Sequence, residues 1–380
     1  MGNFLVLTEL FAPTRGGSAV WFDKVYRLLG GRSTHILTAK VANDEQHDAE
    51  SPLTIHRLKL ERNPMLKPES LPMYLRLLGH GIKLALSEDF HSIHAGRVLP
   101  EGLIALLISS LVGKPCLIYA HGEEITTWNQ PAKQKALRFV YRHATGVVAN
   151  SRFTRDLLLD MGVSSDRVHL INPGVDIHQF HPDLDGTLIK ERYGLKGKKI
   201  IFSVGRLSRR KGFDQMILAL PSIIACVPDA HYVLGGIGED RAYLEELVAD
   251  TGVSDHVTFA GKIPDEELPF WYNLCEVFIM PNRKVGEDTE GFGMVFIEAN
   301  ACGTPAIAGI EGGTADAVVD GETGLRVDGT SIDEIAQAVV RVLSDSQFQD
   351  RLGQQGLRRA HKEFSWESIA DKTKKILELL

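Results

Sequence analysis

The chain has 380 residues, of which 44% are hydrophobic and 24% are charged, and its net charge is −7. This length and balance predict two domains with ample hydrophobic core. The negative charge argues against a nucleic-acid partner, and four separated cysteines without a Cys-x-x-Cys pair argue against disulfides and a zinc site. The longest apolar run, residues 103–112, is too short to cross a bilayer, and residues 3–7 lack the basic lead-in of a signal peptide. We therefore expect a cytoplasmic protein.

Short apolar runs alternate with helical stretches along most of the chain, which is typical of parallel βαβ units. The predicted strands form two series, residues 4–7, 34–37, 92–95, 116–120, 146–149 and 168–171, then residues 200–204, 231–235, 257–259, 277–280 and 306–308. Residues 172–186 between the series are rich in turn formers. The sequence thus predicts an α/β protein with two Rossmann-like domains facing across a cleft, residues 1–180 and 181–365. A last helix over residues 366–380 is expected to pack back on the first domain.

In the first domain, two segments that follow predicted strands are candidates for ligand contact. Gly16 and Gly17 precede a helix, where glycines allow a close approach of the backbone and leave helix N–H groups available. This loop lacks the Gly-x-Gly-x-x-Gly fingerprint, which disfavours a nicotinamide dehydrogenase. His121 follows the strand at residues 116–120, at the edge where an open α/β sheet binds its ligand. A lone histidine is more often structural, but this strand-end position before a glycine favours a site.

The second domain opens with a strand, a glycine and a run of cations. Arg206 can clamp two phosphate oxygens and Lys211 can add a point charge. Arg209 and Arg210, in the same run, are expected to face the solvent. The order Gly-x4-Gly-Lys-Ser/Thr is absent, so the run is not a P-loop. Further along, the backbone at Ile263 is a candidate for contact with a nucleobase edge.

Two carboxylates, Glu290 and Glu298, are separated by seven residues that include Phe292 and Gly293. Glycines followed by an apolar run predict a loop that leads into a buried helix, with Glu290 just before the helix and Glu298 about two turns inside it. The N–H groups and the positive dipole end of the first turn would lie between the acids, where a diphosphate can bind. The alternative is an amphipathic helix with two exposed acids, which the flanking glycine motifs disfavour.

Residues 51–155 are basic, with fourteen Lys or Arg against seven Asp or Glu. One interpretation is a solvated basic face. The other is a surface for anionic lipid headgroups or an anionic acceptor. Within it, residues 53–86 mix cations with apolar residues, among them Met65, Leu66, Leu71 and Leu75. That mixture suits an interfacial segment as well as a core-packing helix.

Taken together, these motifs resemble glycosyltransferase family 4, whose members are retaining, metal-independent enzymes of the GT-B fold. The resemblance rests on Gly16-Gly17, the His121 loop, Gly205-Arg206 with Lys211-Gly212, and Glu290-x7-Glu298, and it extends over nearly the whole chain in family order. Residues 281–294 look most like the bacterial phosphatidylinositol-mannoside mannosyltransferases.

The resemblance implies a nucleotide-sugar donor and no cofactor or metal. Arg206 and Lys211 are then expected to neutralise the diphosphate, Glu298 to bind the ribose, and Glu290 and His121 to contact the transferred sugar. Glu290, His121, Arg206 and Lys211 are accordingly the expected catalytic residues. Four further positions are expected to approach the phosphates or the sugar with their backbone: Gly16, Gly17, Phe292 and Gly293.

The expected donor is GDP-mannose, with UDP-glucose or a similar UDP-sugar next. The expected acceptor is a hydroxyl of a lipid-linked or glycan molecule in cell-envelope synthesis, and peripheral contact with the inner face of the cell membrane is an alternative to a purely cytoplasmic location. A sucrose-phosphate-synthase-like transferase to a soluble sugar phosphate is the second enzymatic hypothesis. A non-catalytic nucleotide-sugar-binding protein is an alternative of a different class. No carboxylate of the first domain stands out as a nucleophile, which favours front-face substitution over double displacement.

Overall fold

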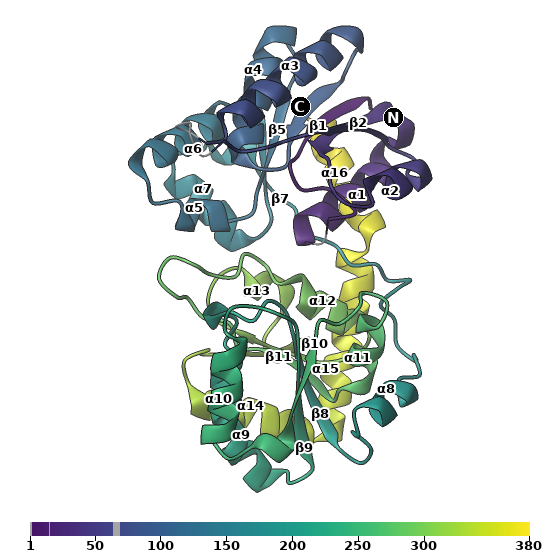
Figure 1. The fold of residues 1–380 in the computed structure, drawn as a ribbon, viewed down its shortest axis with the longest axis vertical. Coiled ribbons are helices and arrows are strands. Elements are labelled where there is room, and N and C mark those ends of the chain that lie inside the picture. The colour runs from purple at the N-terminus through teal and green to yellow at the C-terminus, as the bar shows by residue number, and fades with distance from the viewer. Residues whose placement is uncertain (1, 15, 64–68) are drawn as a thin grey trace. The chain divides into compact units, whose positions relative to one another are not determined.

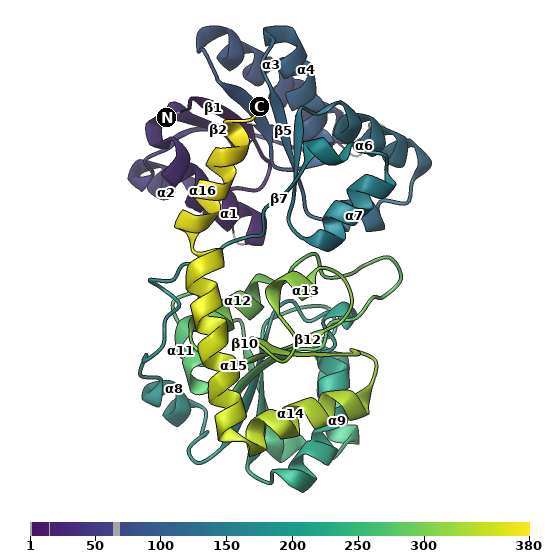
Figure 2. The same ribbon diagram turned by 180° about the vertical axis from the view of Figure 1, so that it is seen from behind.

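The computed structural model describes residues 2–14, 16–63 and 69–380 (Figures 1 and 2). The chain divides into two compact units, one of residues up to Pro173 together with Trp366–Leu380, and one of Gly174–Ser365. The sequence placed the boundary at residue 180, still within the run of turn formers that connects the units. The last helix, α16 (Trp366–Leu377), is part of the first unit.

The first unit is built on a seven-stranded sheet with the order β3-β2-β1-β4-β5-β6-β7, in which all neighbouring strands are parallel. Its strands are β1 (Phe4–Leu7), β2 (Thr34–Ala39), β3 (Thr54–Leu58), β4 (Ser92–Ala95), β5 (Cys116–Ala120), β6 (Gly146–Ala149) and β7 (Val168–Leu170). All strands predicted for this unit are present. The sequence did not predict β3, an edge strand whose residues are all only half-buried.

Helices cover both faces of this sheet. They are α1 (Gly17–Leu29), α2 (Asp44–Glu50), α3 (Leu71–Ser87), α4 (Leu103–Val112), α5 (Glu123–Thr127), α6 (Pro131–His143), α7 (Arg152–Asp160) and α16. The buried sides of α3, α4 and α6 pack with Leu5 and Leu7 on one face. On the other face α1 lies beside α16, and the rings of Trp21 and Phe22 contact Tyr119, with centroids 5.4 and 5.0 Å apart. Figure 2 shows α16 in yellow on the face turned away from α3 and α4.

The second unit has a six-stranded parallel sheet with the order β10-β9-β8-β11-β12-β13. Its strands are β8 (Lys199–Val204), β9 (Ala230–Gly235), β10 (Val257–Gly261), β11 (Val277–Met280), β12 (Ala306–Gly309) and β13 (Gly324–Val327). Its helices are α8 (Thr187–Arg192), α9 (Phe213–Cys226), α10 (Arg241–Asp250), α11 (Leu268–Leu274), α12 (Met294–Ala301), α13 (Thr314–Ala317), α14 (Ile332–Ser344) and α15 (Ser346–Arg359). The sequence did not predict β13. The other strands bring the cationic run after β8 to the same sheet edge as the segment after β11, because parallel neighbours end at the same side.

Residues 53–86, for which the sequence suits an interfacial segment as well as a core-packing helix, include β3 and most of α3. On α3, Met73 and Leu77 are buried in the core, whereas Leu71 and Leu75 are exposed. Met65 and Leu66 lie outside the described residues, as does Arg15 in the first glycine loop. Among the helices described here, none is long and apolar enough to span a membrane.

Glu101 is a carboxylate with no exposed surface in the first unit. Its Oε1 accepts the N–H of Glu9 at 2.8 Å, and its Oε2 has no hydrogen-bond partner in the described part of the chain. Burial raises the pKa of Glu101 to about 7, although the hydrogen bond from Glu9 and the charge of Arg97 act in the opposite direction. The folded protein therefore retains a proton at Glu101 over a pH range in which an unfolded chain releases it.

We expect Glu101→Gln to increase the free energy of unfolding more at pH 8 than at pH 5. The free energy of unfolding of the wild type falls as pH rises from about 4.5 towards 7, because the unfolded state then binds fewer protons than the folded state. Above pH 7 the full cost of burying the ionised Glu101 is present. A shift of this size corresponds to ~3 kcal/mol at most. Thermal unfolding at both pH values checks this, with the exposed Glu61→Gln as control. A Tm difference that is the same at both pH values contradicts the expectation.

Candidate active site

The cationic run after β8 forms a tight turn, η4 (Arg209–Lys211), that leads through Gly212 into α9. Gly212 has a φ of 75°, and a Cβ there would lie 2.0 Å from the carbonyl oxygen of Pro281. Only glycine fits this backbone position, because other residues would meet both the unfavourable φ and the clash. The turn thereby fixes the direction in which Arg210 and Lys211 leave the backbone.

Arg210, Lys211 and Glu290 form a compact ion cluster. Lys211 Nζ and Arg210 Nη1 each donate to Glu290 Oε2 at 2.6 Å, and Arg210 Nε lies 3.1 Å from Asp288 Oδ2. The side chains of Lys211 and Glu290 are each 12% exposed and that of Arg210 is 21% exposed. In the described part of the chain, Glu290 Oε1 has no hydrogen-bond partner. The expectation that Arg210 faces the solvent is wrong, because the η4 turn directs it onto Glu290.

The charge state of Glu290 follows from these neighbours. Burial alone raises the pKa of its carboxyl group, but the charges and hydrogen bonds of Lys211 and Arg210 outweigh this and lower the pKa to about 2. Glu290 is therefore ionised at neutral pH. Its Oε1 is an acceptor available to a hydroxyl group.

Backbone contacts hold the Glu290 loop in place. The N–H of Gly313 donates to the carbonyl oxygen of Glu290 at 2.8 Å, and a Cβ on Gly312 would lie 2.2 Å from the same oxygen. Gly293, with a φ of 89°, precedes α12, and a Cβ there would lie 2.6 Å from the ring of Phe296. These glycines allow the loop to pack tightly against the turn before α13 and against α12.

Glu298 is the fifth residue of α12, a little more than one turn from its start. The predicted position two turns inside the helix is wrong, because the helix begins only at Met294, after the Gly293 cap. Glu298 Oε2 accepts the hydroxyl group of Tyr272 at 2.8 Å. Burial, with a smaller contribution from Asp265, raises the pKa of Glu298 to about 7.

Two other predicted residues of this unit lie apart from the cluster. The Arg206 side chain is 74% exposed, and its Nε pairs with Glu239 Oε2 at 3.0 Å. Ile263 is buried and packs on Gly235, where a Cβ would lie 2.4 Å from Ile263 Cδ1. The structure thus brings Lys211 and Glu290 into contact, and places Arg206 at the surface with an exchangeable partner.

The predicted residues of the first unit lie at the carboxyl ends of its strands. His121 Nε2 donates to the carbonyl oxygen of Gly96 at 2.9 Å, and the His121 N–H donates to Glu124 Oε1 at 3.0 Å. Burial lowers the pKa of His121 although Glu124 acts against this. The imidazole is therefore neutral at pH 7, and its Nδ1 carries the free lone pair. Gly16 and Gly17 lie at the start of α1.

His121 lines a small cavity of about 100 Å³. The lining residues are Ser18, Arg97, His121, Glu123, Glu124 and Trp128. The sequence did not single out Arg97 or Trp128. Arg97 is the second residue after β4 and His121 is the first after β5, so a search for polar residues just after strand ends would also have found Arg97.

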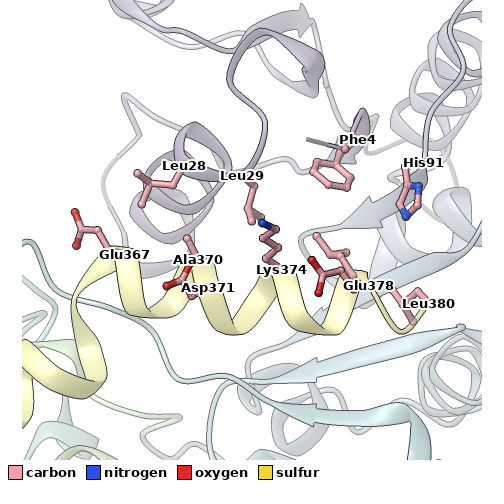
Figure 3. A pocket seen from close by; sticks show the side chains of 12 residues that line it. Phe4, Leu28, Leu29, His91, Glu367, Ala370, Asp371, Lys374, Glu378 and Leu380 are labelled. Carbon is pink, nitrogen blue, oxygen red and sulfur yellow. The ribbon is translucent and has the colours of Figure 1, made fainter.

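A larger cavity of about 650 Å³ lies beside α16 (Figure 3). Lys374 and Glu378 of α16 extend towards Leu29 and Phe4, and His91 closes the other side. Phe4 begins β1 and His91 precedes β4, so this cavity is at the amino ends of the strands. Ligands of open α/β sheets bind at the carboxyl ends, and we assign it no part in the site.

Two parallel α/β units in one chain are the architecture of the GT-B fold, and the matching family models are those of glycosyltransferases. Residues 186–359 match the model of "Glycosyl transferases group 1" and residues 15–179 match that of "Glycosyltransferase Family 4". The chain is 32% identical to a GDP-mannose-dependent alpha-(1-6)-phosphatidylinositol monomannoside mannosyltransferase of Mycolicibacterium smegmatis, over 95% of this chain and 94% of that protein. The protein therefore belongs to glycosyltransferase family 4, and the predicted family is confirmed.

Solved structures confirm the predicted fold class. Anabaena Alr3699/HepE in complex with UDP and glucose superposes with a TM-score of 0.83 at 18% identity, over the whole of both chains. Sucrose-phosphate synthase from Thermosynechococcus elongatus superposes with a TM-score of 0.82 at 24% identity, over 99% of this chain and 98% of that one. At these identities the likeness concerns the fold alone.

A buried ion pair between Arg283 and Asp214 holds the backbone next to the cluster of Arg210, Lys211 and Glu290. Arg283 donates from Nη1 and Nη2 to the two carboxylate oxygens of Asp214, at 2.8 and 2.7 Å, and the Asp214 side chain is only 5% exposed. The N–H of Arg283 donates to the carbonyl oxygen of Arg210 at 2.9 Å. The pair therefore connects α9, the η4 turn and the loop after β11.

We expect Asp214→Asn to lower the free energy of unfolding by about 3–5 kcal/mol, because it leaves the largely buried Arg283 without its counter-charge. The control is Glu267→Gln, which breaks the more exposed Arg192–Glu267 pair and should cost less than about 1 kcal/mol. Urea unfolding of both variants measures the two costs. Equal costs would show that the Asp214–Arg283 pair does not support the fold as described.

Proposed function

We propose that this glycosyltransferase transfers a mannosyl group, with retention, from GDP-mannose to a hydroxyl group of a lipid-linked acceptor. The observation that carries the proposal is the cluster of Lys211, Arg210 and Glu290, which offers cations for a diphosphate and a carboxylate oxygen for a sugar hydroxyl. The 32% identity to a GDP-mannose-dependent mannosyltransferase, over nearly the full length of both chains, supports the choice of donor.

Arg206 and Lys211 are the proposed ligands of the diphosphate. The Arg206–Glu239 pair is exposed on both sides, and such pairs contribute little stability, so Arg206 can exchange Glu239 for a phosphate at low cost. The largely buried Lys211 can leave Glu290 only if another anion replaces it, and the diphosphate is that anion. Two cations placed where negative charge develops on the leaving group stabilise the transition state without a metal ion.

Glu290 and His121 are the proposed ligands of the transferred sugar. Glu290 Oε1 and His121 Nδ1 are both acceptors suited to sugar hydroxyl groups. Glu298, held by Tyr272, is proposed to bind the ribose, and the backbone at Ile263 to contact the base. Backbone contacts to phosphates or sugar are proposed for four further residues: Gly16, Gly17, Phe292 and Gly293. The Phe292 ring is buried beside Phe364, which is consistent with a backbone role.

For the chemical step we propose front-face substitution. The bond from the anomeric carbon to the phosphate oxygen breaks, the acceptor oxygen bonds to the same face, and the acceptor proton passes to the leaving phosphate oxygen. Double displacement requires a carboxylate on the opposite face of the sugar. Glu124, beside His121, is an unsuitable nucleophile because it is buried and its Oε1 already accepts the His121 N–H and the Tyr141 hydroxyl group.

We expect GDP-mannose to raise the Tm of the wild type more than UDP-glucose does, because the ligand bound most tightly by the native state stabilises it most. Lys211→Ala should lose most of this shift and at least ~100-fold in turnover, since one donor removed from a charged transition state costs about that much. Glu290→Gln should keep the nucleotide-dependent shift and lose turnover. Lys284→Ala, in the exposed Lys284–Glu287 pair, is the control.

Scintillation counting of transferred mannose, with and without EDTA, measures the turnover. Activity should be equal in both conditions, because no metal ion enters the proposed step. Near-normal rates in both Lys211→Ala and Glu290→Gln would exclude this site, and loss of activity in EDTA would exclude the metal-free reaction.

Exposed cations and apolar side chains of the first unit support a lipid-linked acceptor. On α6, Lys133, Lys135, Arg138 and Arg142 are exposed, and Phe139 among them is 51% exposed. Exposed leucines gather on two helices that pack together, at Leu71, Leu75 and Leu86 of α3 and at Leu107 and Leu111 of α4. Not all of the basic residues 51–155 contribute to such a surface. Arg57, for example, is largely buried and bound to Asp48.

The alternative is transfer to a soluble sugar phosphate, for which the likeness in fold to a sucrose-phosphate synthase is the supporting observation. The basic surface would then serve as a phosphate site. The two hypotheses differ in whether the protein binds a lipid surface.

We expect the protein to co-sediment with vesicles that contain about 30% anionic phospholipid and not with neutral vesicles, because each Lys or Arg near an anionic surface contributes about 1 kcal/mol. Lys135→Glu with Arg138→Glu should weaken this binding at least ~10-fold, while Lys284→Glu on the second unit should not. Absence of binding to anionic vesicles at low salt would favour the soluble acceptor.

A further inference from the structure

Arg210 is not among the proposed ligands of the diphosphate or of the sugar. Its Nη1 donates to Glu290 Oε2 at 2.6 Å, its Nε pairs with Asp288 at 3.1 Å, and its carbonyl oxygen accepts the N–H of Arg283. Arg210 is thus fixed at both its side chain and its backbone.

Arg210 and Lys211 bind the same oxygen of Glu290 but differ in how they are anchored. In the described part of the chain, the only ion-pair partner of the Lys211 ammonium group is Glu290. Arg210 also has Asp288, and its backbone is tied through Arg283 to the buried Asp214. A diphosphate that binds Lys211 therefore draws one of the two cations away from Glu290 and leaves the other in place.

We propose that Arg210 is the positioning residue for Glu290: it keeps this carboxylate ionised and oriented when Lys211 moves to the diphosphate of the donor. The inference rests on the proposed function, in which Lys211 is a diphosphate ligand and Glu290 Oε1 accepts a hydroxyl group of the sugar. Because Arg210 binds Oε2, it leaves Oε1 available in both states.

Among the residues that the structure describes, few charged groups lie next to Glu290. Its neighbours are Lys211 and Arg210 on η4 and Asp288 in its own loop, while the turn over Gly312 and Gly313 packs against it with backbone atoms. Glu311, which precedes that turn, is exposed. Among the described residues that pair with Glu290, Arg210 is accordingly the only cation that can remain once Lys211 has moved.

Two other carboxylates of this protein show what burial does without a cation in contact. Burial raises the pKa of both Glu101 and Glu298 to about 7, whereas the pKa of Glu290, with two cations bound, is about 2. A Glu290 carboxyl group that loses both cations is therefore expected to retain its proton near neutral pH. It then becomes a weaker acceptor for a sugar hydroxyl group, because hydrogen bonds to an ionised carboxylate are stronger than those to a neutral carboxyl group.

The first test is the pH profile of kcat for mannosyl transfer between pH 5.5 and 8.5. In Arg210→Ala, kcat at pH 6 should fall at least ~10-fold below its value at pH 8.5, while the wild-type profile changes less than ~2-fold. The KM for the donor should change less than ~3-fold, because Arg210 does not bind the diphosphate. Arg210→Lys, which retains a charge, should restore most of the wild-type profile.

Arg209→Ala is the matched control, since it removes a neighbouring charge that does not touch Glu290. The Arg209 guanidinium lies over the ring of Tyr243 and pairs with Asp240 at 3.4 Å. Arg209 Nη1 also lies 3.7 Å from Asp214 Oδ2, and Asp214 keeps its two shorter contacts with Arg283 when Arg209 is removed. The pH profile of kcat in Arg209→Ala should equal that of the wild type. A loss in Arg210→Ala that is uniform at all pH values would indicate a purely structural role and overturn the proposal, as would a wild-type profile.

The second test needs no activity, and thus separates this inference from the proposed function. Lys211→Ala imitates the departure of Lys211, and its Tm should change little between pH 5 and 8 relative to wild type. In Lys211→Ala with Arg210→Ala, the pKa of Glu290 is raised in the folded state, so stability should fall as pH rises from 5 to 8. Adding Glu290→Gln should remove that fall. If the double variant shows no additional pH dependence, Arg210 does not control the ionisation of Glu290, whatever the wild type transfers.

Discussion

The structure of the candidate site depends on how one buried carboxylate is kept charged. A carboxylate removed from water is expensive unless cations and hydrogen bonds replace the solvent. Glu290 meets this condition with two cations on one oxygen, and its pKa is lowered to about 2. Glu101 and Glu298 do not, and the pKa of each is raised to about 7. At neutral pH the charge of Glu290 thus differs from that of Glu101 and Glu298, because only Glu290 has cations within hydrogen-bond distance.

The backbone around the cluster is shaped to bring these groups together. The cations arrive from the turn after β8, and Glu290 arrives from the loop after β11, its neighbour in the sheet. Gly212 lets the η4 turn lie against Pro281, and Gly312 lets a second turn lie against the carbonyl oxygen of Glu290. A side chain at either glycine would push these segments apart, and the hydrogen bonds of the cluster at 2.6 Å require their close approach. The parallel strands and the close-packed turns therefore determine which charged groups contact Glu290.

Much of this arrangement can be predicted from the sequence, because its signals are local. Runs of buried apolar residues such as residues 116–120 mark central strands, and Lys211 and Glu290 are marked by glycines at strand ends. The strands β3 and β13 escape prediction because an arginine interrupts each of them, Arg57 in β3 and Arg326 in β13. The partnership of Arg210 with Glu290 also escapes, because it joins residues 80 positions apart through a turn whose geometry depends on Pro281. The start of α12 also escapes prediction, because the helix begins only at Met294, after the Gly293 cap.

The two cations proposed to bind the diphosphate begin from different states. Arg206 pairs with Glu239 at the surface, where water replaces a lost partner at little cost. Lys211 is largely buried and bound to Glu290, so it can leave only for another anion. On the proposed function, Arg206 is then the cation free to meet the donor first, and Lys211 follows once the diphosphate is close enough to replace Glu290. In that proposal, the departure of Lys211 frees Glu290, the proposed sugar ligand, from one of its two cations only when the donor is present. A site organised in this way keeps its buried charges paired at every stage, which the cost of an isolated buried charge requires.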